Sequence, residues 1–145
     1  MIKYLLDVNV LVALLDEDHV HHKDVLKWFD MPGIQWAICA FAEAGLLRHM
    51  ARQKLDLMSL DIVSDMLDRL TQHPGYHYQP ITADWQSLSA PIAKRLHGHN
   101  QVTDAFLLGL AIREEMVLAT LDKGILHMAG DHRDHVLLLG ASQTQ

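Results

Sequence analysis

The chain has 145 residues, of which 50% are hydrophobic and 21% are charged, and its formal net charge at pH 7 is −6. This length and composition are typical of one globular domain with its own core, and they exclude two separate domains, a collagen-like fibre and general disorder. The negative net charge argues against a protein that holds nucleic acid by bulk electrostatics, because such domains usually have a pI above about 9.

The first half of the chain is predicted to alternate strands with helices. Ile2 to Leu6 is a short apolar run, which is typical of a parallel strand buried on both faces. Helical patterns follow, one from Val10 and one from about His19 to Asp30. Ile34 to Ile38 is the second candidate strand, and the next helix is expected from Ala40 to about Gln53.

The second half of the chain continues the alternation. A helix is predicted from Leu60 to Leu70, and a third strand from about His77 to Ile81, after a turn at Pro74-Gly75. Two helices and two strands complete the chain, at about Ala83 to Leu96, Val102 to Glu114, Val117 to Thr120 and Val136 to Leu139. Strands that alternate with helices form a parallel sheet covered on both faces, so the sequence predicts an α/β sandwich.

The cysteine content and the apolar runs indicate where the protein works. Cys39 is the only cysteine, which excludes an internal disulfide and a cysteine-cluster metal site and fits a reducing cytosol. The longest clean apolar run, Ala105 to Ile112, is far shorter than the roughly 18 residues of a membrane span. The first apolar run ends at Asp7, which does not match a secretory signal. We therefore expect a cytoplasmic protein that does not act in a membrane.

Four acidic residues fall where the predicted strands and helices meet. They are Asp7 after the first strand, Glu43 in the opening turns of the helix after the second, Asp104 near the start of its helix, and Asp122 two residues after the strand at Val117 to Thr120. Ligands of open parallel sheets bind at the carboxyl edge of the strands. We therefore expect the four carboxylates to meet at that edge.

Carboxylates that are brought together raise one another's pKa unless a positive charge compensates them. Ligand sets made only of oxygen atoms favour Mg²⁺ or Mn²⁺ over zinc. A water bound to such a cation can attack a phosphodiester, while the cation stabilises charge on the phosphate oxygens. The hypothesis from the residues is therefore metal-dependent phosphodiester hydrolysis.

A structural role is open for each acid taken alone. An Asp after a strand is often a helix N-cap, and Asp104 beside Thr103 is placed for a cap or for a favourable interaction with the helix dipole. Glu43 lies in the apolar stretch AICAFAEAGLL, where a charge is costly unless it is paired or coordinated. One metal ion explains four acids at one edge more economically than four separate caps.

Four segments of the chain resemble, in order, the blocks of PIN-domain nucleases, and specifically the VapC-type toxins of bacterial toxin–antitoxin pairs. The segments are LLDVNVLVALLDEDHVHH at Leu5 to His22, WAICAFAEAGLLR at Trp36 to Arg48, GHNQVTDAFLLGLA at Gly98 to Ala111, and LATLDKGI at Leu118 to Ile125. The set spans nearly the whole chain, and only the middle, about Asp56 to Leu96, carries little of the resemblance.

The resemblance implies a PIN-like three-layer α/β/α sandwich, formed by residues 1–145 as one domain, with a central parallel sheet of four or five strands. It implies endoribonuclease activity that depends on Mg²⁺, with Mn²⁺ as a substitute. The implied catalytic residues are Asp7, Glu43, Asp104 and Asp122, of which Asp7 and Asp104 bind the metal. Asn9 and Thr120 match polar positions of the family, and we expect them to orient carboxylates or metal-bound water.

The resemblance also implies partners. These are an RNA substrate, a small VapB-like antitoxin that docks beside the acidic groove, and a second copy of the chain in a homodimer. Cations near the acids are candidates for contacts with RNA phosphates, which would restore affinity that the net charge lacks. These candidates are Arg48, Arg52 and Lys54 after Glu43, and Lys123 beside Asp122. A favourable charge at a helix end is the alternative role for the first three.

Several other residues are given structural roles. His19 and His22 are spaced to share a helix face, but no third zinc ligand is evident, so we expect a solvated helix start or a partner contact. Cys39 is expected in the core, because no basic neighbour activates its thiol. The three tryptophans are also expected in the core, and not as platforms for stacked bases.

Other functions remain open at this point. An aspartyl-phosphate phosphatase or a receiver domain also has an Asp after its first strand, but Asn9 stands where such a phosphatase would carry its second acid. A housekeeping RNA-processing nuclease and a catalytically silent binding module fit the same fold. The RNA that is cut, the number of metal ions and the identity of the antitoxin are not specified by the sequence.

Overall fold

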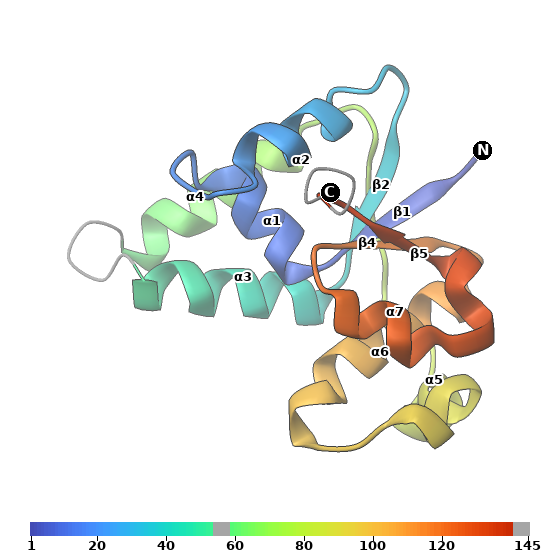
Figure 1. Ribbon diagram of the computed structural model, residues 1–145. Coiled ribbons are helices and arrows are strands. Elements are labelled where there is room, and N and C mark those ends of the chain that lie inside the picture. The colour runs from blue at the N-terminus through green and yellow to red at the C-terminus, as the bar shows by residue number, and fades with distance from the viewer. Residues whose placement is uncertain (54–58, 141–145) are drawn as a thin grey trace.

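A sheet of parallel strands forms the centre of the molecule (Figure 1). A computed structural model describes residues 1–53 and 59–140. Within these residues the sheet has five strands in the order β3-β2-β1-β4-β5. The strands are β1 (Lys3–Leu6), β2 (Gln35–Ile38), β3 (Tyr76–Tyr78), β4 (Val117–Thr120) and β5 (Val136–Leu138). All four strand pairings are parallel.

Helices cover the sheet in two groups (Figure 1). The first group is α1 (Val8–Leu15), α2 (His22–Phe29), α3 (Ala40–Gln53) and α4 (Leu60–Leu70). The second group is α5 (Trp85–Ser89), α6 (Val102–Arg113) and α7 (Lys123–Ala129), with the short 3₁₀ helices η1 (Ala90–Arg95), η2 (His99–Gln101) and η3 (Gly130–His135). The predicted α/β/α sandwich with a parallel sheet is confirmed. No helix among the described residues has the length and hydropathy needed to cross a membrane.

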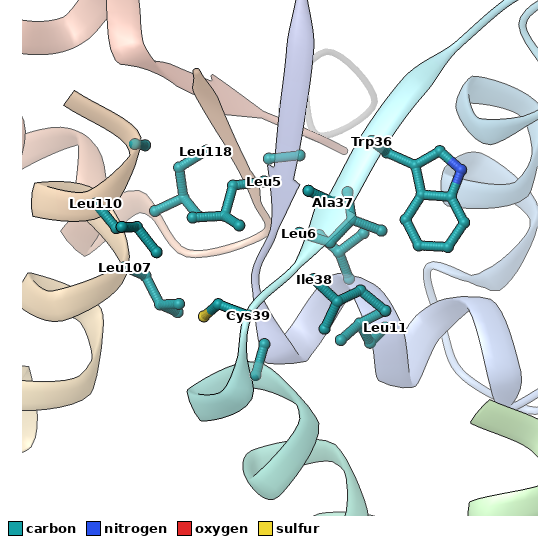
Figure 2. Close-up of a cluster of buried hydrophobic side chains, with 14 of the residues drawn as sticks. Leu5, Leu6, Leu11, Trp36, Ala37, Ile38, Cys39, Leu107, Leu110 and Leu118 are labelled. Carbon is teal, nitrogen blue, oxygen red and sulfur yellow. The ribbon is translucent and has the colours of Figure 1, made fainter. Parts of the chain in front are cut away.

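The hydrophobic core lies on both faces of the strands, because successive side chains of a strand point to opposite faces. Leu5 pairs with Leu118 in the register of β1 and β4, and Leu107 and Leu110 of α6 approach these two residues from the same side (Figure 2). Trp36, Ile38 and Leu11 of α1 lie toward the other face (Figure 2). These seven side chains are completely buried.

The order of the strands fixes where a ligand site can form. From β1 the chain proceeds outward to β2 and β3, and it then returns to the other side of β1 to add β4 and β5. The direction of winding therefore reverses between β1 and β4. In open parallel sheets this reversal leaves a crevice at the carboxyl ends of the two strands. Asp7 follows β1 and Asp122 follows β4, so both acids lie at this crevice.

The structure corrects several predicted boundaries. The helix expected from Ala83 to Leu96 is instead α5 followed by η1, because Pro91 has no N–H to continue an α-helix. The strand expected at His77 to Ile81 is β3, which starts at Tyr76, since Gly75 already accepts a hydrogen bond from the Trp36 amide. A side chain on Gly75 would collide with the carbonyl oxygen of Ile34. Helix α7 and the 3₁₀ helices were not predicted.

The helix expected from His19 to Asp30 begins only at His22. The ring Nδ1 of His19 instead accepts a hydrogen bond from the amide of His21 at 3.0 Å, which stabilises a turn before α2. His22 lies with its Nδ1 2.7 Å from the Ala13 carbonyl oxygen of α1. The two imidazoles therefore do not share a helix face, contrary to the spacing argument.

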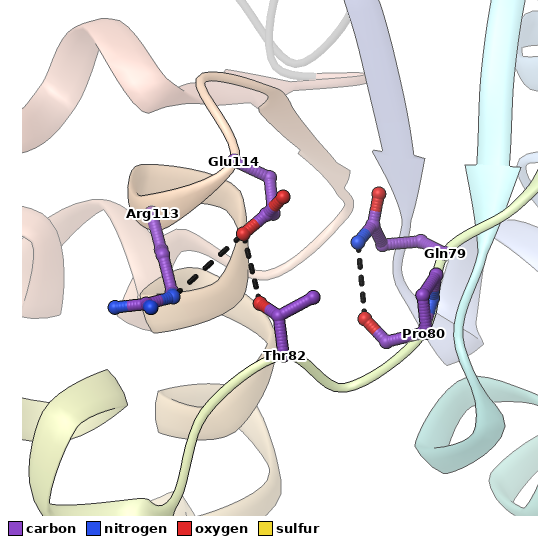
Figure 3. A network of polar contacts seen from close by, with 5 residues as sticks. All are labelled: Gln79, Pro80, Thr82, Arg113 and Glu114. Atoms are coloured by element: carbon purple, nitrogen blue, oxygen red, sulfur yellow. Dashed lines mark hydrogen bonds and ion pairs between the residues drawn. The ribbon is translucent and has the colours of Figure 1, made fainter.

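The connection from β3 to α5 is fastened to the end of α6 (Figure 3). The hydroxyl of Thr82 donates a hydrogen bond to the Glu114 carboxylate at 2.8 Å, and Arg113 Nε lies 3.8 Å from the same oxygen. Gln79 Nε2 donates to the Pro80 carbonyl in the same connection. Exposed pairs of this kind contribute less than about 1 kcal/mol each, so they position α6 without dominating its stability.

Candidate functional site

A cavity of about 260 Å³ opens at the carboxyl edge of the sheet, beside the ends of β1 and β4. Its lining comes from α1, the turn before α2, α3, the start of α6 and the residue before α7. The lining residues are Asp7, Val8, Asn9, Val12, His19, His49, Thr103, Asp104 and Asp122. Three of the four predicted acids, and one of the two predicted orienting residues, therefore share one cavity.

Asp7 is buried and accepts two hydrogen bonds beside this cavity. The carboxylate is 4% exposed, and its Oδ1 accepts a hydrogen bond from the Val8 amide at 2.7 Å, as the N-cap of α1. The other oxygen, Oδ2, accepts a hydrogen bond of 2.7 Å from the buried hydroxyl of Thr120. Asp7 thus caps α1 and also lines the cavity, so the N-cap role and the proposed role as a metal ligand are compatible.

Thr120 and Asn9 connect the two strands that flank the crevice. The Thr120 hydroxyl oxygen accepts hydrogen bonds from the Asp122 amide at 3.1 Å and from Asn9 Nδ2 at 3.4 Å. Asn9 Oδ1 in turn accepts a hydrogen bond from the Leu121 amide at 3.1 Å. The network links the first turn of α1 to the loop after β4, and it fixes Asp7 relative to Asp122.

Asp104 and Asp122 lie on two different helix starts. Asp122 is the N-cap of α7, and its Oδ1 accepts a hydrogen bond from the Gly124 amide at 2.8 Å. Asp104 lies in the first turn of α6. Within the described part of the chain, no hydrogen bond or ion pair is formed by the Asp104 carboxylate, in contrast to Asp7 and Asp122.

The electrostatics of the cavity are those of crowded negative charge. Burial, reinforced by the nearby charges of Asp7 and Asp122, raises the pKa of Asp104 to about 7. Burial also raises the pKa of Asp7, although the hydrogen bonds from Thr120 and Val8 oppose this effect. A carboxylate whose pKa is raised by its neighbours is stabilised in the charged form by an added cation.

The donor set of the cavity fits a divalent cation that keeps much of its water. No group of three or more His, Cys, Asp or Glu side chains in residues 1–53 and 59–140 is arranged to hold a metal ion by itself. Mg²⁺ is usually bound through one or two carboxylates and several waters, so a closed cage of ligands is not needed. Asp7 and Asp104, both in the lining, provide such a pair of carboxylates.

Glu43 stands apart from the other three acids. It lies in the first turn of α3, half-buried, and it is absent from the residues that line the cavity. Its charge acts on the Cys39 thiol and the Tyr76 hydroxyl, whose pKa values are raised mainly by burial and further by Glu43. Asp7, Asp104 and Asp122 therefore line one cavity, and Glu43 is not among the residues that line it.

The predicted RNA-binding cations do not line the acidic cavity. Arg48 and Arg52 are exposed on α3, and Lys123 is exposed at the first position of α7. Lys54 lies outside the described residues. Contacts between these cations and RNA stay a prediction.

Two histidines of the cavity were not singled out by the sequence as part of the acidic site. His19 reaches it from the turn before α2, and His49 from α3. Burial, together with the neighbouring histidines, lowers the pKa of His19, which keeps this imidazole neutral over a wider range of pH. The distance in sequence between these residues and the acids gave no local signal, since only the packing of α1 between α2 and α3 brings them together.

Comparisons with known proteins agree with this fold. The family described as PIN domain matches residues 4–131. Ribonuclease VapC44 of Mycobacterium tuberculosis is 36% identical over 140 residues, which cover 93% of this chain and 98% of that protein. Ribonuclease VapC29 of the same organism is 33% identical over 127 residues, which cover 88% of this chain and 91% of that protein.

Solved structures show the same fold at lower sequence identity. The crystal structure of VapBC2 from Rickettsia felis, bound to a DNA fragment from their promoter, aligns with a TM-score of 0.65 and 16% identity, over 94% of this chain and 97% of that chain. The crystal structure of FitAcB from Neisseria gonorrhoeae aligns with a TM-score of 0.62 and 20% identity, over 88% and 93% of the two chains. The chain therefore belongs to the PIN-domain family, with VapC ribonucleases among its relatives.

Proposed function

We propose that this protein is an endoribonuclease that depends on Mg²⁺ or Mn²⁺ and acts as the toxin of a toxin–antitoxin pair. The observation that carries the proposal is the convergence of Asp7, Asp104 and Asp122 on one cavity at the point where the winding of the sheet reverses. The identity of 33 to 36% with proteins named as VapC ribonucleases supports RNA as the substrate.

The acidic residues and their hydrogen-bond partners have different roles in the proposed cation site. Asp7 and Asp104 hold the cation, and Asp122 adds negative charge at the edge of the cavity. Glu43 is proposed as a fourth acid that acts from the margin. When bound, the cation supplies Lewis-acid stabilisation of phosphate charge and makes water more acidic. Thr120 donates a hydrogen bond to Asp7 and so holds the orientation of that carboxylate, while Asn9 donates a hydrogen bond to Thr120 and keeps its hydroxyl in place.

A removal experiment tests the proposal. Purified protein is incubated with RNA and Mg²⁺, with RNA and Mn²⁺, and with RNA and excess EDTA. We expect cleavage with either cation and none with EDTA, because the acids alone offer no group that neutralises the charge of the phosphate. Restoring Mg²⁺ in excess over EDTA should restore cleavage. Cleavage that continues unchanged in EDTA contradicts the proposal.

The positioning role of Thr120 gives a second prediction. In Thr120→Val the shape is kept, but Asp7 loses its donor and the pKa of Asp7 rises further, since that hydrogen bond lowers it. We expect cleavage to fall by about 10- to 100-fold, the usual cost of removing a partner of a metal ligand, and to be partly recovered at higher Mg²⁺ concentration. Thr120→Ser keeps the hydroxyl and should stay within a few-fold of the wild type. If Thr120→Val cleaves RNA at the wild-type rate, Thr120 has no positioning role in the site.

The proposed partners follow from the relatives. The solved structures that share the fold include one titled as a toxin-antitoxin complex and one as VapBC2 bound to promoter DNA, which supports a VapB-like antitoxin for this chain. A homodimer, a cytosolic location and one domain over residues 1–145 are part of the same proposal. The free, buried thiol of Cys39 fits a reducing compartment. A neighbouring antitoxin reading frame, whose product suppresses cleavage when added, would separate a toxin from a housekeeping nuclease.

A further inference from the structure

A second and larger cavity, of about 870 Å³, is lined by residues of η1, η2, α7 and η3. We call it the cationic cavity. Its charged and titratable lining residues are Lys94, Arg95, His97, His127, Asp131 and His132. Five of these six carry or can accept a positive charge, although the whole chain has a net charge of −6. The local charge is thus opposite to that of the molecule.

The cations of this cavity are not used for internal stabilisation. Within the described part of the chain, neither Lys94 nor Arg95 forms an ion pair, although Asp131 lines the same cavity. The guanidinium of Arg95 lies over Gly130, where a β-carbon would be 2.1 Å from Arg95 Nε. The missing side chain at this position, whose φ is +54°, therefore leaves room for Arg95. Unpaired guanidinium and ammonium groups around an open cavity favour a phosphate, which guanidinium binds with two parallel hydrogen bonds.

The cationic cavity adjoins the acidic one. Gln101 lines the cationic cavity, and Thr103, two residues later, lines the acidic cavity. Gly124 and Asp122 have the same relation at the start of α7. Two residues of chain span at most about 7 Å, so the two cavities share their walls on both sides. The His97 amide donates a hydrogen bond to the Gln101 side chain, which fastens the loop before α6 to this shared wall.

We infer that the cationic cavity binds the backbone phosphates of the RNA strand next to the bond that is cut, through Lys94 and Arg95. The inference rests on the proposed function, because it assigns the substrate strand its path away from the acidic cavity. It also indicates how a protein of negative net charge could hold a polyanion, because Lys94 and Arg95, which form no ion pair in the described part of the chain, line a cavity next to the acidic one. Phosphate contacts of this kind position a strand without reading its sequence.

Binding measurements test the inference separately from cleavage. The probe is a fluorescein-labelled single-stranded RNA of mixed sequence and about 16 nucleotides, titrated in EDTA with protein in the Asp7→Asn background so that cleavage during the measurement is minimal. Lys94→Ala/Arg95→Ala is compared with Lys23→Ala/Lys27→Ala, which removes two cations from helix α2, none of whose residues lines either cavity. Far-UV circular dichroism and thermal melts confirm that both variants are folded.

We expect the Lys94→Ala/Arg95→Ala variant to bind RNA about tenfold more weakly. The slope of the logarithm of the association constant for RNA against the logarithm of the salt concentration should become less negative by about 0.7 for each phosphate contact that is lost. The α2 variant should match the parent protein in both quantities. Equal affinity and equal slope in the two variants would overturn the inference. The inference would also be overturned if the Lys94→Ala/Arg95→Ala variant bound RNA normally but lost binding to poly-glutamate. That result would show that the cavity binds an acidic protein segment instead of RNA.

The outcomes also separate this inference from the proposed function. If the wild-type protein cuts RNA only with metal and the Lys94→Ala/Arg95→Ala variant binds RNA as the control does, the nuclease stands and the phosphate site is wrong. If no metal-dependent cleavage is found but the variant loses RNA affinity and salt slope, the cavity binds RNA and the nuclease assignment is wrong. In the active enzyme the same variant should raise KM and leave kcat within a few-fold, because the contacts lie outside the reacting atoms.

Discussion

Asp7→Asn is expected to reduce RNA cleavage by at least about 100-fold while the protein stays folded. The carboxylate is the most buried of the acids and one of two proposed ligands of the cation. Electrostatic stabilisation by a bound metal contributes several kcal/mol to a phosphoryl transition state, and each 1.36 kcal/mol corresponds to a factor of ten in rate. An asparagine keeps one carbonyl oxygen for the Val8 amide, so the cap of α1 survives.

The measurement is initial cleavage rate with Mg²⁺, together with a thermal melt of each protein. Asp68→Asn is the matched control, since it removes one exposed carboxylate from α4 that does not line the acidic cavity. The control should cleave RNA at the wild-type rate. If Asp7→Asn retains wild-type activity, the assignment of Asp7 as a metal ligand is wrong. If the melt shows that Asp7→Asn is unfolded, other substitutions of Asp7 that leave the protein folded are assayed, and wild-type activity in one of them also contradicts the assignment.

Asp104→Asn is expected to make the metal-free protein more stable at pH 8, by about 1–2 kcal/mol. The pKa of Asp104 is raised to about 7 from an ordinary value of 3.8. An effect of this size would correspond to about 4 kcal/mol for a fully buried carboxylate, and we expect less because Asp104 is partly solvated and because asparagine lacks a favourable charge at the start of α6. Removing the charge therefore relieves repulsion with Asp7 and Asp122.

The effect of Asp104 on the free energy of unfolding depends on pH. A folded-state pKa above the unfolded value means that the folded protein holds the proton more tightly. The stability lost through Asp104 is therefore close to zero below about pH 4, grows between about pH 4 and pH 7, and reaches its full value above pH 7. Urea melts in EDTA should show no difference between variant and wild type at pH 4 and the full difference at pH 8. Excess Mg²⁺ should stabilise the wild type and not the variant.

A control substitution at Asp61 distinguishes two effects of Asp104 on stability, which are repulsion by the other acids and a favourable charge at a helix start. Asp61 lies in the first turn of α4, as Asp104 does in α6, but it is away from the acidic cavity. Asp61→Asn should be neutral or slightly destabilising at pH 8. If Asp104→Asn is destabilised as Asp61→Asn is, Asp104 serves chiefly as a favourable charge at a helix start.

The elements with a strong local pattern were predicted closely. The apolar runs before Asp7 and Asp122 are β1 and β4, and Val102 to Glu114 is α6 within one residue, because buried parallel strands and helix periodicity are visible in adjacent residues. The region from Ala83 to Leu96 was predicted less well. There a proline and the packing of Gly109 against the Leu88 carbonyl set the path of the chain, and a window of neighbouring residues does not contain that contact.

The sequence by itself determined the fold class and the edge of the sheet at which the four acids were expected, since parallel strands joined by helices have all their carboxyl ends on the same side. Only the tertiary structure decided that these three acids share a cavity with His19 and His49 while Glu43 does not, and that Lys94, Arg95 and His127 line a second cavity beside it. The physical reason is that distances between side chains of separate helices are set by how the helices pack on the sheet, and no local pattern of residues encodes that packing.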